Sequence, residues 1–228
     1  MNAMKDKILF VVTSHGELGD TGKKTGYFLS EVTHPWSVLG EYYDIDVVSP
    51  KGGRPPVDGF DLSDPINARF WNDAAWQEKM GSTMTPDDVD PSLYKAIFYA
   101  GGHGAMWDFP HNEKLASIAS RIYENGGFVA AVCHGPAGLL PIRLADGEEF
   151  VKGRKLTSFT NPEEYANGTA DIVPFLLETA LENEGAIFQE GPMWGDNVVV
   201  DGRLITGQNP MSALSLGKAL LKALQNVE

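Results

Sequence analysis

Thiols are almost absent from this chain, because Cys133 is the only cysteine among its 228 residues. A single cysteine excludes an internal disulfide and a cluster of thiolates around zinc. Any role of this sulfur is therefore nucleophilic, redox-sensing or structural. Most free cysteines act only as small buried apolar side chains, so a chemical role has to be argued from the residues around Cys133.

Basic residues and long apolar runs are also scarce. The 18 Lys and Arg residues are outnumbered by 31 Asp and Glu residues, and the formal net charge of −13 repels nucleic acid and acidic membranes. We therefore expect no nucleic-acid partner and no membrane association. No apolar run approaches the ~18 residues that span a bilayer, and residues 1–7 lack the apolar segment of a signal peptide, so we expect a cytoplasmic protein.

The length and the apolar content are those of one folded α/β domain over residues 1–228. Short apolar runs alternate with stretches of helical periodicity, which predicts a doubly wound, mostly parallel sheet sandwiched by helices. Strands are expected at residues 7–12, 45–50, 95–99, 128–132 and 156–159. The Asp201-Gly202 pair predicts a hairpin turn. The Gly-x-Gly-x-x-Gly fingerprint of dinucleotide sites is absent, and we expect no cofactor.

Residues 54–91 differ from the rest of the chain in composition. They are rich in Pro, Asp and Gly but also carry several aromatic residues, and we interpret them as an insert with a helix over residues 64–80. The aromatic residues in question are Phe60, Phe70, Trp71 and Trp76. They would roof a pocket, form a dimer contact or pack as a small satellite core, and the satellite core is the preferred interpretation.

The apolar run of residues 128–132 leads directly into Cys133, His134, Gly135 and Pro136. This pattern predicts a buried strand that turns sharply into a helix, a nucleophile elbow. A thiol at a helix N-terminus is exposed to free backbone N–H groups and to the positive end of the helix dipole. We therefore expect the pKa of Cys133 to lie below its ordinary value of about 8.5, with the sulfur partly or wholly a thiolate.

Polar segments follow four of the predicted strands. They are residues 13–15, residues 101–103, residues 133–134 and residues 160–164. Because the carboxyl ends of parallel strands meet at one edge of the sheet, we expect these segments to converge there. The backbone N–H groups of Gly102 and His134 would then stabilise an oxyanion formed by attack of the Cys133 sulfur. This arrangement indicates acyl or carbonyl chemistry.

A proline interrupts the helical pattern of residues 25–39. Pro35 removes the hydrogen bond to the carbonyl group of Glu31, so we expect a local bend or loosening beside that carboxylate.

Four segments together resemble the ThiJ/PfpI superfamily, which is class I glutamine amidotransferase-like. They are residues 24–35, 100–104 (Ala-Gly-Gly-His-Gly), 131–136 (Ala-Val-Cys-His-Gly-Pro) and 201–210. More narrowly, they resemble the branch of heat-inducible chaperones that act as glutathione-independent glyoxalases of the glyoxalase III type. The resemblance implies a flavodoxin-like fold and a homodimer.

The resemblance also implies roles for individual residues. Cys133 is the nucleophile, His134 lies beside it, and Glu31 is hydrogen-bonded to the thiol. An acid between residues 161 and 164 orients the histidine, and Glu164 is preferred to Glu163. Some members hold a metal between two histidines and a carboxylate; we place no such trio in this sequence and expect no metal.

The expected function is conversion of methylglyoxal or a related 2-oxoaldehyde, a small reactive aldehyde, to the 2-hydroxy acid lactate without glutathione. Cys133 would form a hemithioacetal, and Glu31 or His134 would move the proton between carbons. The side chains of His15 and His103 would only shape the pocket. The open alternatives are a protein or nucleotide deglycase, a cysteine amidase or peptidase, and a non-enzymatic stress holdase or redox sensor.

Overall fold

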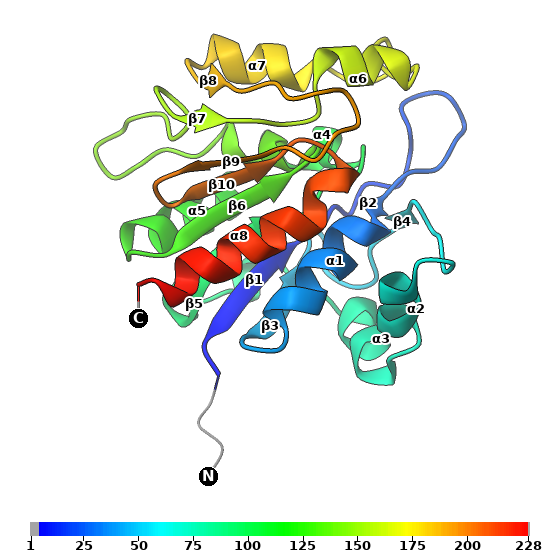
Figure 1. Ribbon diagram of the computed structural model, residues 1–228, viewed down its shortest axis with the longest axis vertical. Coiled ribbons are helices and arrows are strands. Elements are labelled where there is room, and N and C mark those ends of the chain that lie inside the picture. Colours follow the sequence, from blue (N-terminus) through cyan, green and yellow to red (C-terminus); the bar gives the residue numbers. More distant parts are fainter. Residues whose placement is uncertain (1–4, 228) are drawn as a thin grey trace.

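The computed structural model describes residues 5–227, and one six-stranded sheet forms its centre (Figure 1). The strands lie in the order β3, β1, β5, β6, β10, β9, and all run parallel except β9, which pairs antiparallel with β10. They are β1 (Lys7–Val11), β3 (Asp44–Val48), β5 (Tyr94–Tyr99), β6 (Phe128–Val132), β9 (Val198–Asp201) and β10 (Leu204–Gly207). The predicted doubly wound, flavodoxin-like sheet and its hairpin at Asp201-Gly202 are confirmed.

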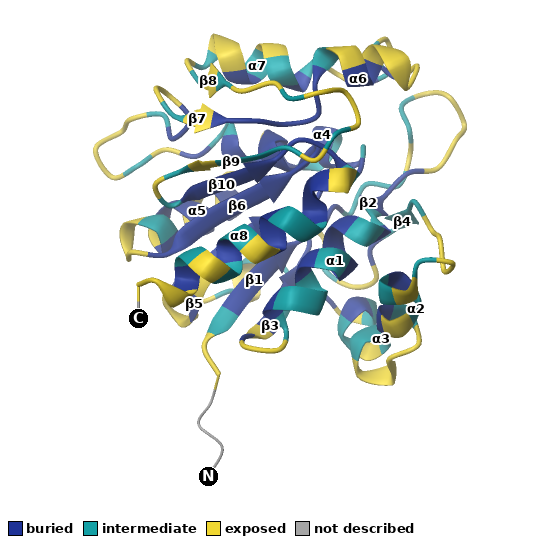
Figure 2. Ribbon diagram, viewed as in Figure 1, coloured by how far each residue is buried: buried dark blue, intermediate teal, exposed yellow. Residues whose placement is uncertain are grey.

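Helices cover both faces of this sheet. α1 (Leu29–Leu39) and α8 (Ala213–Gln225) lie on one face, and α5 (Glu113–Glu124) lies on the other (Figure 1). Along each strand the side chains alternate between the two layers, so that Leu9 packs with the α5 side and Phe10 with the α1 and α8 side. Figure 2 shows the strands buried and the outer helix faces exposed. Each large apolar side chain that is fully buried contributes roughly 1.5–3 kcal/mol to stability.

Shorter elements complete the chain. The short helices are α2 (Pro65–Trp71), α3 (Ala74–Gly81), α4 (Ala105–Asp108), α6 (Asn161–Ala166) and α7 (Leu177–Asn183), with 3₁₀ turns η1 (Pro86–Asp88), η2 (Pro91–Leu93), η3 (Gly135–Leu139) and η4 (Pro210–Ser212). Two small parallel pairs join β2 (Tyr27–Phe28) to β4 (Val57–Asp58) and β7 (Lys155–Leu156) to β8 (Ile187–Phe188). Within residues 5–227, no helix has both the length and the apolar character that crossing a membrane requires.

The helix predicted over residues 25–39 begins only at Leu29. The N–H group of Tyr27 donates to the Pro56 carbonyl (3.0 Å) and that of Phe28 to the Gly101 carbonyl (3.1 Å), so these residues are extended. From Leu29 the helix continues through Pro35 to Leu39.

Two further predictions for local structure were wrong. The strand expected over residues 156–159 is the two-residue β7, which pairs with β8 outside the main sheet. Beyond it, the Thr157 N–H donates to the Thr206 hydroxyl (2.9 Å) instead of to a strand carbonyl. The helix expected over residues 64–80 is the pair α2 and α3, because the Asp73 side chain caps a new helix there.

The aromatic residues of the insert were expected to form a small satellite core, but Phe70 belongs to the main apolar layer under α1 and α8, and Trp71 and Trp76 pack against that layer. Phe70 is fully buried and contacts both Trp36 (ring centroids 5.1 Å apart) and Trp76 (5.2 Å). Phe60 is exposed and packs edge-on against Trp71. Of these four side chains, Phe60 is exposed, Trp71 and Trp76 are partly buried, and Phe70 is fully buried.

Candidate active site

Cys133 stands on a strained turn immediately after β6. Its φ is 60°, in the left-handed region that residues other than glycine rarely adopt. The Cys133 N–H donates to the Gly207 carbonyl (3.0 Å), which fixes the end of β6 against β10, and η3 begins two residues later. Strain of this kind is concentrated at functional sites. The local geometry is that of the predicted nucleophile elbow.

His134 and Glu164 form a chain of contacts from the sulfur. Cys133 Sγ lies 3.4 Å from His134 Nδ1, and His134 Nε2 lies 2.7 Å from Glu164 Oε2. An Nε2–H donated to the carboxylate leaves the Nδ1 lone pair facing the thiol, the tautomer that a general base needs. Glu164 is thus the acid that meets the histidine, as preferred from the sequence.

Two adjacent glutamates on α6 serve different partners. The Thr160 and Glu163 side chains form a capping box that starts the helix. Glu163 Oε1 accepts hydrogen bonds from the backbone N–H of Trp194 (2.9 Å), from Gln208 Nε2 (3.0 Å) and from Asn209 Nδ2 (2.8 Å). Glu163 therefore holds the segment around Trp194 in place while Glu164 faces the histidine.

The charges of the His134 and Glu164 pair are set by opposing effects. Burial disfavours ionised Glu164, but His134 and His103, through charge and hydrogen bonds, hold the pKa of this carboxyl well below its usual value. Burial and the neighbouring His103 lower the pKa of His134 despite the carboxylate. At neutral pH the pair is therefore a neutral imidazole and a carboxylate.

Glu31 lies on α1 with its side chain fully buried. Its Oε2 accepts a hydrogen bond from the Gly101 N–H (2.6 Å). Burial raises the pKa of Glu31 to about 8 against the opposing effects of the Cys133 thiol and the Gly101 N–H, so the carboxyl group is protonated at neutral pH. Among the residues described, Oε1 has no hydrogen-bond partner of good geometry, and the hydrogen bond from the thiol that the family resemblance implies stays a prediction.

The expectation of a resting thiolate was wrong. Burial raises the pKa of Cys133 well above its usual value, and the carboxyl groups of Glu31 and Glu164 raise it further. The segment after the elbow is also a short 3₁₀ turn and not a helix with a full dipole. The Gly102 N–H, by contrast, favours the thiolate. The sulfur is therefore a thiol that needs a base when it reacts.

Two glycines bring the neighbouring loop against the elbow. A Cβ on Gly101 would lie 2.4 Å from Glu31 Oε2 and 2.7 Å from the Val132 carbonyl oxygen. Gly102 has a φ of 101°, and a Cβ there would lie 2.0 Å from the Gly26 carbonyl oxygen. Side chains at either position would push the loop away. Their absence lets the Gly102 N–H reach the sulfur, near the place predicted for an oxyanion.

His103 has a larger part than the sequence indicated. Its Nε2 lies 2.8 Å from Glu164 Oε1, and the Thr169 hydroxyl donates to the same oxygen. The signal was present in residues 100–104, but His103 was expected only to shape the pocket. His15 instead stacks on Trp107, with ring centroids 4.9 Å apart, and stays outside the cavity lining.

A histidine–histidine–carboxylate trio does exist, although none was placed from the sequence. The ligand atoms of His103, His134 and Glu164 lie within 4.8 Å of one another. Each nitrogen already has its own carboxylate oxygen as partner, at 2.8 Å and 2.7 Å. The two imidazoles and the carboxylate therefore satisfy one another as a hydrogen-bonded network.

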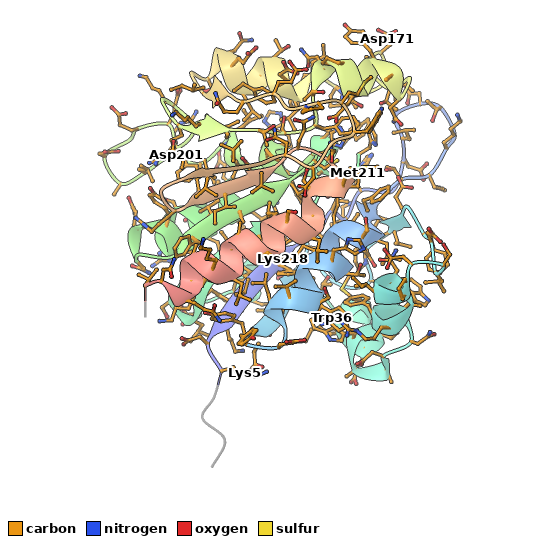
Figure 3. The ribbon with its side chains drawn as sticks, in the orientation of Figure 1. Lys5, Trp36, Asp171, Asp201, Met211 and Lys218 are labelled. Atoms are coloured by element: carbon orange, nitrogen blue, oxygen red, sulfur yellow. The ribbon has the colours of Figure 1, made fainter. Side chains whose placement is uncertain are left out.

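A cavity of about 660 Å³ opens above Cys133 and His134. Phe28, Phe159 and Trp194 form an apolar part of the cavity wall. Met211 also lines the cavity, and it lies in η4, beside the start of α8 (Figure 3). The reactive groups lie at the carboxyl end of β6, near the β1 and β5 pair where the strand order reverses, the usual place for a ligand in such a sheet.

Comparisons with known proteins agree with this geometry. The chain is 35% identical to Glyoxalase 3 of Candida albicans, over 96% of this chain and 98% of that protein. It is 34% identical to the glutathione-independent glyoxalase HSP31 of Saccharomyces cerevisiae, over the same shares. The structure of Rapid Encystment Protein 24 kDa of Francisella tularensis superposes with a TM-score of 0.92 at 38% identity, covering 96% of this chain and 99% of that one. The model of the DJ-1/PfpI family matches residues 24–223, and with the elbow and its histidine in place, the chain belongs to that family.

Proposed function

We propose that this protein converts methylglyoxal or a related 2-oxoaldehyde to the 2-hydroxy acid without glutathione. The relatives named glutathione-independent glyoxalase support this proposal over nearly the whole chain. The observation that carries it is the contact of Cys133 with two proton carriers of different kinds. These are neutral His134, 3.4 Å from the sulfur, and protonated Glu31.

The first step is addition of the thiol to the aldehyde carbon. His134 Nδ1 takes the thiol proton, and the sulfur forms a bond to C1. The Glu164 carboxylate stabilises the imidazolium that results. The Gly102 and His134 backbone N–H groups stabilise the oxyanion until His134 returns the proton and completes the hemithioacetal.

The second step moves hydrogen from C1 to C2. His134 removes the C1 proton while Glu31 donates its own proton to the C2 oxygen, which gives an enediol. His134 then protonates C2, and the Glu31 carboxylate recovers a proton from the C1 hydroxyl. The aldehyde carbon is thereby oxidised and the ketone carbon reduced, and both side chains return to their starting states.

The last step is hydrolysis of the thioester left on Cys133. His134 removes a proton from water, the water oxygen attacks C1, and the thiol leaves with a proton. The balance is one 2-oxoaldehyde and one water consumed for one 2-hydroxy acid released, with no external oxidant or reductant.

The direct test is incubation of the purified protein with methylglyoxal in buffer free of glutathione, with lactate measured by NMR. We expect lactate to appear in proportion to the methylglyoxal lost. Loss of methylglyoxal without lactate, at the rate seen with a heat-inactivated sample, would sink the proposal.

A further inference from the structure

The cavity is much larger than the substrate that the reaction requires. Methylglyoxal has five non-hydrogen atoms, and at about 30 Å³ for each water-sized group it fills at most roughly 150 Å³. The cavity holds about 660 Å³. Most of this space therefore lies beyond the aldehyde group that Cys133 would attack, and the residues lining it bear on which substrates enter.

One wall of that space is a polar face of α1. Ser30 and His34 both line the cavity and lie four residues apart, so they occupy the same face of the helix. His34 Nε2 lies 2.6 Å from Asp64 Oδ2. Among the described residues, none hydrogen-bonds to the Ser30 hydroxyl, which is left to bond a ligand.

The insert supplies the adjoining wall through Asp58, Asp61, Asp64 and Asn67. The carboxylates are already engaged with the protein: Asp58 with Thr25 (3.1 Å) and with the Gly59 N–H (2.7 Å), and Asp61 and Asp64 in comparable bonds. Because each carboxylate oxygen can accept more than one hydrogen bond, these groups can still receive O–H donors.

The charge of this region favours a neutral ligand. Lys23 and Lys24 line the same cavity as the three aspartates, so cationic and anionic groups are interspersed. A fully ionic ligand of either sign would meet groups of its own charge. Neutral hydroxyl groups, which both donate and accept hydrogen bonds, are compatible with this mixture of carboxylate, amide, imidazole and hydroxyl groups.

An aromatic residue completes the lining. Trp194 has a φ of 60° and a partly exposed side chain, and its backbone N–H donates to the buried Glu163 carboxylate at 2.9 Å. Backbone strain maintained by a buried anchor is typical of a ligand contact. The indole ring offers a flat apolar surface to the C–H groups of a carbon chain.

We propose that this cavity accepts 2-oxoaldehydes that carry a polyhydroxylated carbon tail, the class of compound formed when sugars dehydrate. The inference rests on the proposed function, since the aldehyde end reacts at Cys133 as methylglyoxal does. The tail bonds Ser30, His34 and Asp64 and lies against Trp194. The bond changes are the same, with water as the only co-reactant.

The test compares two substrates on the purified protein without glutathione. One is methylglyoxal and the other is 3-deoxyglucosone, a six-carbon 2-oxoaldehyde with a hydroxylated tail. We expect both to be converted to their 2-hydroxy acids, with the larger substrate having the lower KM. If neither reacts, the proposed function fails. If methylglyoxal reacts and the six-carbon substrate does not, only this inference fails.

Variants locate the tail. Asp64→Asn keeps an N-cap side chain for α2, and Trp194→Ala removes the indole. We expect each to lower the ratio of kcat/KM for the six-carbon substrate to that for methylglyoxal by at least about fivefold, mainly through KM, as loss of one or two hydrogen bonds or an aromatic contact implies. Tyr42→Ala, at an exposed position that does not line the cavity, is the matched control. An unchanged ratio in both variants would overturn the proposal.

Discussion

Replacing Glu31 by glutamine removes the carboxyl group whose pKa the fold raises from 4.5 to about 8. In the unfolded chain this group loses its proton near pH 4.5, while in the folded protein it keeps the proton until about pH 8. The folded state therefore binds more protons between these values, and the free energy of unfolding falls as pH rises through this window. Below pH 4.5 the group is protonated in both states, so the free energy of unfolding no longer depends on its titration.

The size of the effect follows from the two pKa values. Their difference, at about 1.4 kcal/mol per pH unit, corresponds to roughly 5 kcal/mol lost across the whole window. The wild-type protein should lose about 4 kcal/mol relative to Glu31→Gln between pH 5 and pH 8, because glutamine does not titrate. The titrations of His134 and Glu164 occur in both proteins and cancel in the comparison.

Urea denaturation of both proteins at pH values from 5 to 9 measures this difference. We expect the two stabilities to diverge steadily up to about pH 8 and to run parallel above it. Parallel curves throughout would show that Glu31 ionises at its ordinary pKa and would refute the assignment of Glu31 as the protonated acid. The same logic predicts that wild-type kcat/KM declines above about pH 8.

Other substitutions test the remaining parts of the site. Glu164→Gln should lower kcat by about 10²–10⁴-fold, because the imidazole loses the group that fixes its tautomer; wild-type kcat in this variant would remove Glu164 from the mechanism. Glu163→Ala should lower the free energy of unfolding by about 3–5 kcal/mol in urea denaturation, since three donors lose a buried carboxylate. Glu163→Gln should restore part of that stability, and a Glu163→Ala variant as stable as the wild type would contradict the anchoring role. Gly101→Ala should abolish turnover, because its Cβ would meet Glu31 Oε2 at 2.4 Å and backbone atoms at under 3 Å; a fully active variant would show that the loop moves freely.

The sheet was predictable because its strands are short continuous apolar runs, whereas the apolar residues of the helices between them recur at helical spacing. The sites of Cys133 and His134 followed from the end of one such run, where topology alone brings loops together. What failed depended on tertiary contacts. The segment after Leu156 bonds a side-chain hydroxyl instead of a strand, and the start of α1 is displaced by bonds from Tyr27 and Phe28 to distant carbonyls.

The protonation states were the least predictable part of the site. Local sequence suggested a helix dipole beside Cys133, but the segment is a short 3₁₀ turn, and burial and two carboxyl groups raise the pKa of the thiol. The role of His103 depends on Glu164, which is 61 residues away in the chain. The single domain, the homodimer, the cytoplasmic location and the absence of a metal stay predictions.

The central claim is that the Cys133 sulfur forms the bond to the substrate. The most direct measurement is glutathione-free conversion of methylglyoxal by the wild type and by Cys133→Ser, combined with mass spectrometry of protein quenched during turnover. We predict lactate and a covalent adduct on Cys133 for the wild type, and neither product nor adduct for Cys133→Ser. Lactate formation by Cys133→Ser at a rate near that of the wild type would contradict the claim.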